Sequence, residues 1–159
     1  MSRNKLKILF AVYGTVMLYM LLFGRESWRQ SALDWEQVKL HINLVPLRTV
    51  RHMIWAAQYR LEHYGDTYLI WFAIKNLGGN LLLFIPLGIF LPSLWPGQRR
   101  FRVCCLTVTG LICVIEVVQL LATVGSMDVD DLIFNVAGAA MGYGIWRLTH
   151  PKSHAKCSP

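Results

Sequence analysis

Two neighbouring hydrophobic stretches near the C-terminal end carry polar side chains at positions that share helical faces. Glu116 and Gln119 lie in the interior of the first stretch, and the second begins near Asp131 and contains Asn135. At 3.6 residues per turn, each polar pair falls on one stripe of its helix while the other faces stay apolar. An ionisable residue inside such a segment costs about 2.5–3.5 kcal/mol on insertion scales, so it normally faces a partner helix or a wet cavity. The pattern predicts a polar site between membrane helices, with Glu116 at its centre.

The loop between these stretches carries three carboxylates, Asp128, Asp130 and Asp131. Carboxylate oxygens are the ligands that Ca²⁺ and Mg²⁺ prefer, so these residues are candidate ligands of a divalent cation, the one cofactor left open. They also precede a hydrophobic stretch, where the positive end of a helix dipole favours acidic caps. Glu116 is the candidate for acid–base chemistry. No catalytic residue is assigned, because no nucleophile–base pair or histidine cluster lies in these stretches.

A third stretch, which precedes the other two in the chain, adds Lys75, Asn76 and Asn80. At a rise of 1.5 Å per residue, Asn76 and Asn80 lie roughly 12 and 18 Å from the start of their helix, and Glu116 lies about 12 Å from the end of its own. These depths fall in the same half of a membrane, with Lys75 as the expected cationic neighbour of Glu116 or Asp131. The predicted site is an outward-facing pocket lined by Lys75, Asn76, Asn80, Glu116, Gln119, Asp128, Asp131 and Asn135.

The composition is that of a membrane protein, since 55% of the 159 residues are hydrophobic, 16% are charged, and the mean hydropathy is +0.41. Such a chain is too apolar for an ordinary soluble domain and too short for a large transporter. We therefore predict an all-α integral membrane protein with a single domain over residues 1–159. About four transmembrane helices are expected, at residues 6–24, 68–92, 103–124 and 132–148, with an extracytoplasmic or interfacial segment at residues 25–67.

Local patterns refine the N-terminal half. The apolar run at residues 8–23 is followed by Gly-Arg-Glu-Ser, which fits a retained first helix better than a cleaved signal peptide. Residues 48–64 are amphipathic and favour a helix that lies on the membrane surface. Residues 41–47 are too short to span, so we expect a loop or a re-entrant turn against the helices.

Small residues and prolines refine the C-terminal half. Pro86 and Gly88 predict a kink or local unwinding in the second half of the second span. Gly138 and Gly142 form a G-x-x-x-G pair, which indicates close helix packing. The cysteines lack metal-ligand spacing and do not favour a disulfide framework, because they lie in the third span and the tail: Cys104, Cys105, Cys113 and Cys157.

The distribution of charge predicts the orientation. The N-terminal arm, residues 99–102 and the C-terminal tail together hold nine Lys and Arg and no Asp or Glu. The segments expected outside hold six Lys and Arg and eight Asp and Glu. By the positive-inside rule, both termini are cytoplasmic in a multi-pass protein of the cell membrane. The net charge of +7 then reflects orientation and contact with anionic lipid headgroups, and we expect no nucleic acid as a partner.

Four blocks of residues, in this order and spacing, resemble the VanZ family. They are Asn43-Leu-x-Pro46, Asn76-x-x-Gly79-Asn80-x-x-Leu83-Phe84-x-Pro86-Leu-Gly88, Glu116-x-x-Gln119, and Asp128-Val-Asp130-Asp131-Leu-Ile-x-Asn135-x-x-Gly138. The resemblance covers nearly the whole chain. Two departures are Leu47, where the family often has Phe, and residues 124–127, which lack the Arg that many members place before the acidic loop. The resemblance implies a membrane protein linked to tolerance of glycopeptide antibiotics, especially lipid-bearing ones such as teicoplanin.

Three classes of function remain open. The first, which we favour, is a non-enzymatic envelope protein that binds a lipid-linked or wall-related molecule and so weakens the action of lipoglycopeptides. The second is a small membrane enzyme acting on a lipid-linked wall precursor, with Glu116 as acid or base and Asp128 and Asp131 holding a divalent cation. The third is a proton-coupled carrier that uses Glu116. The expected partners are the lipid bilayer and a lipid-linked wall precursor or lipoglycopeptide, and a homo-oligomer is left open.

Overall fold

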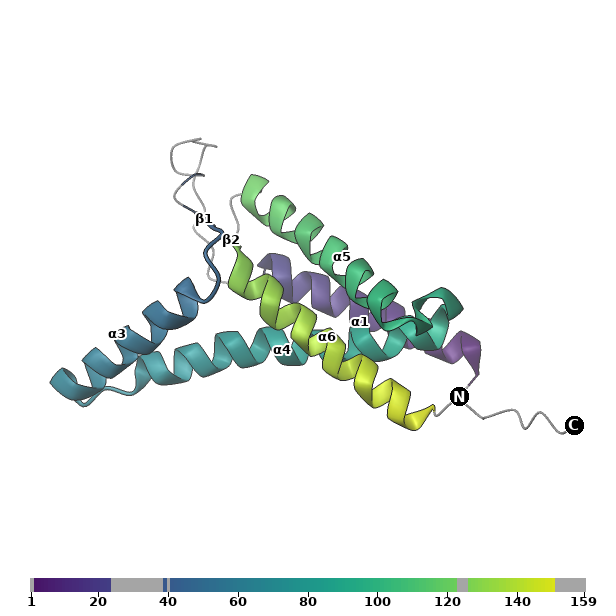
Figure 1. Cartoon of the computed structure of the whole chain (residues 1–159), viewed down its shortest axis with the longest axis horizontal. Coiled ribbons are helices and arrows are strands. Elements are labelled where there is room, and N and C mark those ends of the chain that lie inside the picture. Colours follow the sequence, from purple (N-terminus) through teal and green to yellow (C-terminus); the bar gives the residue numbers. More distant parts are fainter. Residues whose placement is uncertain (1, 24–38, 40, 123–125, 151–159) are drawn as a thin grey trace, which may run out of the picture.

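A computed structural model describes residues 2–23, 39, 41–122 and 126–150 of the chain. This part of the chain is helical apart from two short strands (Figure 1). Its elements are α1 (Arg3–Phe23), β1 (Ile42–Asn43), α3 (Arg48–Tyr64), α4 (Tyr68–Leu94), η1 (Pro96–Arg99), α5 (Phe101–Leu121), β2 (Met127–Asp128) and α6 (Val129–Thr149). The predicted all-α class is confirmed, and each predicted span corresponds to a helix. Most of the segment expected outside, before β1, lies beyond the described residues.

Three of these helices, α1, α4 and α5, are long and apolar enough to cross a membrane. The helix α6 has 21 residues, as α5 does, but is not among them. It contains Asn135 and Arg147 and is rich in glycine and alanine, which offer little hydrophobic surface. The expectation of spanning helices is thus supported for three of the four, and a membrane position for α6 stays a prediction.

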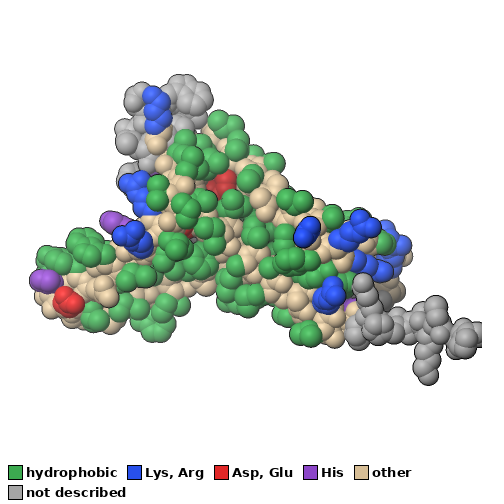
Figure 2. All heavy atoms as spheres, viewed as in Figure 1, with side chains coloured by type: hydrophobic (Ala, Val, Ile, Leu, Met, Phe, Trp, Pro, Cys, Tyr) green, Lys and Arg blue, Asp and Glu red, His purple; other side chains and the backbone are tan. Residues whose placement is uncertain are grey.

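The four long helices α1, α4, α5 and α6 pack together, and the chain reverses direction between successive members (Figure 1). The start of α1, the end of α6 and the turn at η1 lie at one end of this bundle (Figure 1). Lys and Arg side chains gather at the same end (Figure 2), where the start of α5 contributes Arg100 and Arg102. The clustering of cations at one end is what the positive-inside rule requires of a cytoplasmic side. Which side of a membrane this end faces stays a prediction.

The contact between α4 and α6 depends on glycine. A Cβ added at Gly138 or Gly142 would lie 2.1 or 1.9 Å from a backbone carbonyl oxygen of α4. A Cβ added at Gly88 would lie 1.9 Å from the carbonyl oxygen of Ala139. Any larger residue at these positions would force the two backbones apart. The close packing predicted from the G-x-x-x-G pair is confirmed.

A hydrophobic core fills the bundle between α1, α4, α5 and α6, with Phe84 and Val108 fully buried at its centre. The hydroxyl of Tyr13 donates to the carbonyl oxygen of Leu83 at 2.7 Å and so ties α1 to α4. The helix α4 continues through Pro86 to Leu94, so the local unwinding predicted there does not occur, and a kink at this position stays a prediction. Close packing on both sides of this turn holds the helix together despite the hydrogen bond that proline removes.

The helix α3 and the first half of α4 form an arm that extends away from the bundle (Figure 1). The helix α3 ends at Gly65, whose φ of 63° is left-handed and lets the chain reverse into α4. Asp66 supports this turn, because it pairs with Arg60 at 3.3 Å and accepts a hydrogen bond from the Tyr68 amide at 2.8 Å. The helix predicted at residues 48–64 is confirmed, and its position on a membrane surface stays a prediction.

Candidate functional site

Five polar residues form a hydrogen-bonded group where β1 leads into α3 and where β2 leads into α6. We call this group the polar cluster, and its members are Asn43, Thr49, Glu116, Asp128 and Asp130. Glu116 is 5% exposed and Asp130 is 1% exposed. Burying a charged group is expensive unless it is paired and hydrogen-bonded. The hydrogen-bond partners of each carboxylate therefore indicate the structural role of the cluster.

Two short parallel strands bring the halves of the cluster together. In the strand pair, Ile42 lies beside Met127 and Asn43 beside Asp128. The side-chain amide of Asn43 donates to Thr49 Oγ1 at 3.0 Å and to Asp128 Oδ1 at 3.1 Å. The same Asn43 also accepts a hydrogen bond from the next-but-one amide, in a local turn typical of asparagine. Asn43 thus joins the loop before α3 to the start of α6.

Asp128 caps α6 and connects that cap to α5 and α3. Its Oδ1 accepts from the amide of Asp130 at 2.9 Å, and its Oδ2 accepts from the Thr49 hydroxyl at 2.5 Å. Its own amide donates to Glu116 Oε2 at 3.3 Å. The acidic cap considered from sequence is confirmed for Asp128. Glu116 is therefore tied to the first turn of α6.

Asp130 caps a different helix from the one it belongs to. Its carboxylate accepts hydrogen bonds from the amides of Leu47, Thr49 and Val50, the last two at 3.0 and 3.2 Å. The N-cap position of α3 is Leu47, with φ 61° and no side-chain cap of its own. The carboxylate of Asp130 satisfies the free amides of α3 and complements its positive dipole end. Sequence reasoning missed this role, and the only signal was an apolar residue at the N-cap position of α3.

Asp131 points to a different helix, since its Oδ1 accepts a hydrogen bond from the side-chain amide of Asn80 and so links α6 to α4. Gln119 and Asn135 are buried nearby in α5 and α6. The Gln119 amide donates to the carbonyl oxygen of Leu21 at 2.6 Å. Gln119 Oε1 and Asn135 Oδ1 find no hydrogen-bond partner within the described part of the chain. We predicted that polar residues of α4, α5 and α6 meet in one site. They instead take part in several separate contacts.

Lys75 does not join these residues. Its side chain is exposed, and no salt bridge connects it to any described residue. Asn76 is half-buried and shares a face of α4 with Asn80, whereas Lys75 is about 140° around the helix from Asn80. The expected pairing of Lys75 with Glu116 or Asp131 is therefore not present.

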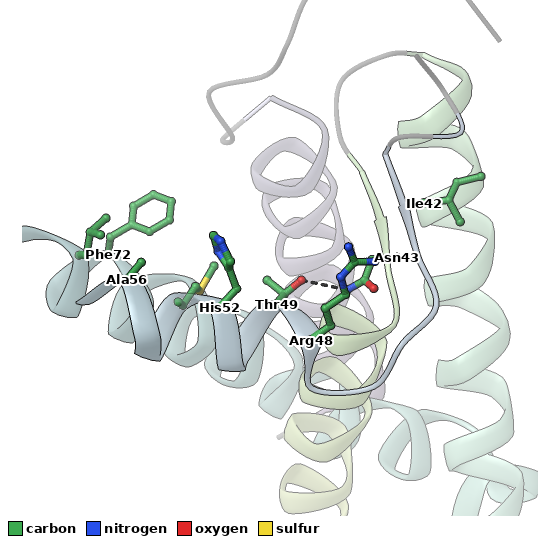
Figure 3. Close-up of a pocket in the computed structure, with 9 residues that line it drawn as sticks. Ile42, Asn43, Arg48, Thr49, His52, Ala56 and Phe72 are labelled. Carbon is green, nitrogen blue, oxygen red and sulfur yellow. Dashed lines mark hydrogen bonds between the residues drawn. The ribbon is translucent and has the colours of Figure 1, made fainter. Parts of the chain in front are cut away.

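A cavity of about 530 Å³ lies beside the polar cluster, between β1, α3 and the start of α4 (Figure 3). We call it the arm cavity, and it is lined by Ile42, Asn43, Arg48, Thr49, His52, Met53, Ala56, Leu69 and Phe72. Asn43 and Thr49 belong to both the cavity and the cluster, and the hydrogen bond between them is drawn in Figure 3. Two members of the cluster, Asn43 and Thr49, thus line the arm cavity, whereas its three carboxylates do not.

A second cavity, of about 500 Å³, lies further along the arm and is almost wholly apolar. It is lined by Met53, Ile54, Ala57, Gln58, Leu61, Ile70, Ala73, Ile74, Leu77 and Gly78. None of the eight residues predicted to line a pocket contributes to either lining. Lys75 faces outward, the other seven of these residues are partly or fully buried, and both cavities lie on the arm.

The three aspartates proposed as cation ligands are directed at different partners. Asp128 and Asp130 accept hydrogen bonds from amides and a hydroxyl, whereas Asp131 contacts Asn80. No group of three His, Cys, Asp or Glu residues is arranged to hold a metal ion among the residues that the structure describes.

The fold and the site define a class of small helical protein, with helices suited to a membrane and with two chain segments joined by buried carboxylates. A family model for VanZ/LLP1 matches residues 10–150. The chain therefore belongs to the VanZ/LLP1 family, as the four sequence blocks indicated. Searches among curated proteins and among solved structures return no match.

Proposed function

We propose that this protein sits in the bacterial cell membrane and lowers susceptibility to lipid-bearing glycopeptide antibiotics of the teicoplanin type. It would do so by binding a lipid-linked or wall-related molecule that these antibiotics also engage. Family membership supports the setting, and three helices of membrane-spanning length and composition support the location. The arm cavity is the feature that supports the binding of such a molecule.

The size and lining of the arm cavity suit a molecule with a polar head and an apolar body. Its volume of about 530 Å³ falls in the range of small-molecule sites, which is about 300–1,000 Å³. Asn43, Arg48 and His52 supply polar groups, whereas Leu69 and Phe72 supply apolar surface. The binding site that we propose is therefore on the arm and not around Glu116.

The polar cluster has a supporting role in this proposal. Asn43 and Thr49 contribute to the cavity wall, and Asp128 and Asp130 hold them in place. Glu116 acts as a positioning residue, because its carboxylate accepts the amide of Asp128 and lines neither cavity. This arrangement supports binding better than acid–base catalysis or proton-coupled transport by Glu116.

The test is the susceptibility of a teicoplanin-sensitive bacterium that expresses the chain. We expect expression to raise the inhibitory concentration of teicoplanin and to leave that of a glycopeptide without a lipid chain unchanged. Ala56→Phe, which places a phenyl ring in the arm cavity and so narrows it, should abolish the increase. Ala11→Phe, on an exposed face of α1, is the matched control and should retain it. An Ala56→Phe protein that folds and still protects the cell would overturn the proposal.

A further inference from the structure

We infer that the arm cavity binds an anionic, phosphate-bearing membrane lipid, with the headgroup held by Arg48 and His52 and the chain lying on Leu69 and Phe72. This inference rests on the proposed function, because it names the class of ligand for the same cavity. The helix α3 supplies the polar edge of the cavity. Arg48, His52 and Ala56 are each four residues apart and form one stripe of α3 along the cavity (Figure 3).

The chemistry of this edge favours phosphate. The Arg48 guanidinium is exposed, lines the cavity and makes no salt bridge with a described residue. A guanidinium offers paired donors that match the oxygens of a phosphate group, and His52 adds a ring nitrogen one turn further along. The Asn43 side chain borders the same space (Figure 3).

The N-terminus of α3 is not available for the anion, which makes side chains the means of recognition. Helix N-termini commonly bind phosphate through their free amides. Here Asp130 already accepts from the amides of Thr49 and Val50. The affinity for an anion must therefore depend on Arg48 and His52. Replacing Arg48 is the most informative change.

The rest of the arm explains why the ligand is a lipid rather than free phosphate. Leu69 and Phe72 of α4 and Met53 of α3 form the apolar part of the arm cavity. Met53 also lines the second cavity, so the two spaces adjoin at this side chain. The second cavity is nearly devoid of polar surface and extends to Leu77, which suits the continuation of a hydrocarbon chain.

The aromatic side chains around the arm fit a lipid environment. Trp55, Tyr59 and Trp71 are exposed on the arm, and the rings of Trp55 and Tyr59 stack with centroids 5.8 Å apart. Exposed tryptophan and tyrosine are typical of the boundary between lipid headgroups and acyl chains. An arm at this level would meet the headgroups and the chains of membrane lipids together.

The experiment uses the full chain in nanodiscs of phosphatidylcholine that contain a trace of phosphatidylglycerol carrying a photoreactive group in its acyl chain. After illumination, mass spectrometry measures the labelled fraction and maps the labelled peptide. We expect labelling within residues 53–77, reduced by unlabelled phosphatidylglycerol but not by inorganic phosphate. A photoreactive phosphatidylcholine should label this segment several-fold less.

Two matched variants make the test specific. Arg48→Gln should reduce the labelling several-fold, whereas Arg51→Gln, an exposed cation of α3 outside the cavity lining, should leave it unchanged. Both side chains are exposed, so both variants should fold, and their melting temperatures serve as the check. Equal labelling by phosphatidylcholine, full competition by inorganic phosphate, or equal losses in both variants would each overturn the inference.

The two proposals fail in different ways. Labelling is measured with purified protein and no antibiotic, so a specific lipid site can be present in a chain that gives no protection against teicoplanin. That result would support the lipid site and reject the proposed function. Protection that is lost in Ala56→Phe but kept in Arg48→Gln, together with unchanged labelling of Arg48→Gln, would reject the anionic ligand and keep the function.

Discussion

Asp130 is the residue at which the end of the chain controls the conformation of an earlier segment. Its carboxylate accepts the amides of Leu47, Thr49 and Val50, some eighty residues away in the sequence. The helix α3 has no capping side chain of its own, so its first turn depends on this contact. The start of α3 is therefore anchored to the bundle by two buried carboxylates, those of Asp130 and Asp128, together with the strand pair beside them.

We expect Asp130→Ala to loosen α3 and to lower the free energy of unfolding by about 1–3 kcal/mol, because the part-buried amides at the start of α3 lose their acceptor. The measurements are a thermal melt followed by circular dichroism and limited digestion by trypsin after Arg48 and Arg51. Digestion should become faster in the variant. Glu62→Ala, which removes an exposed acid from α3, is the control. Equal digestion of Asp130→Ala and the parent would show that the arm does not depend on this cap.

A second prediction concerns the charge of Glu116. Its Oε2 accepts the Asp128 amide, and the oxygen of glutamine can accept the same hydrogen bond, so Glu116→Gln should remain folded. Glu116→Leu removes the acceptor and leaves a buried amide unpaired, which costs about 1–3 kcal/mol. We expect Gln to be stable but unable to protect cells from teicoplanin, and Leu to be both unstable and inactive. Melting temperature and antibiotic susceptibility are the two measurements.

A fully protective Glu116→Gln protein would contradict the requirement for charge. Glu116 would then contribute only to the structure of the α5–α6 junction. The arm cavity would remain the site to pursue, because its lining does not include Glu116.

Single residues of the site were predictable where they interrupt an apolar helix. Glu116, Gln119 and Asn135 stand out for that reason, and all three are buried. The partners Asn43 and Thr49 could not be paired with Asp128 from sequence, because the strands that align them contain only two residues each. Strands of two residues are too short to show the alternation of apolar and polar residues that identifies a strand. No local sequence pattern therefore predicts this contact.

At the scale of elements, the α4–α6 contact is limited by backbone approach rather than by side-chain volume. Gly138→Ala and Gly142→Ala each place a Cβ about 2 Å from a carbonyl oxygen of α4. Overpacking of this kind typically costs about 1–3 kcal/mol, so we expect a lower melting temperature for both variants. Gly144→Ala is the matched control in the same helix, because a Cβ there meets nothing within 4 Å.

The control should be neutral or slightly stabilising, since alanine favours a helix over glycine by about 1 kcal/mol. Equal melting temperatures for Gly142→Ala and Gly144→Ala would mean that α4 and α6 separate at no cost. That result would contradict the close contact described above.

The helices were the most predictable elements. Long apolar runs indicate helices of membrane-spanning length, and the spacing of glycines indicates where two helices pack closely. The predicted range 132–148 fell short of the observed α6, Val129–Thr149. The difference arises because the acidic loop already contains the helix start, with Asp128 as the cap. The arrangement of α3 against α4 was not predictable, since it depends on the turn at Gly65 and on the distant cap from Asp130.

At the scale of the whole molecule, the two ends of the bundle differ, because cations gather at one end and the polar cluster lies near the other. Arg100 and Arg102 lie at the start of α5, at the end of the bundle where α1 begins and α6 ends, and cations gather there (Figure 2). The polar cluster lies near the other end of α5 and α6, and the arm joins the bundle beside it (Figure 1). In the orientation expected from the positive-inside rule, the arm and its cavities are on the extracytoplasmic side, where a wall-directed antibiotic would meet them.

The last prediction tests this orientation directly. Gly97 is exposed in η1, and Ser126 precedes β2, so the 21-residue helix α5 lies between the two positions. At 1.5 Å per residue this helix is about 30 Å long, which is the thickness of a hydrocarbon core. In a cysteine-free background, Ser126→Cys should react with a membrane-impermeant maleimide on intact cells, and Gly97→Cys should react only after permeabilisation. The helices α4 and α6 run alongside α5 in the bundle, and the arm joins the bundle at the Ser126 end (Figure 1). The reverse labelling pattern would therefore place the arm cavity on the cytoplasmic side, out of reach of the antibiotic. The proposed function would then be wrong.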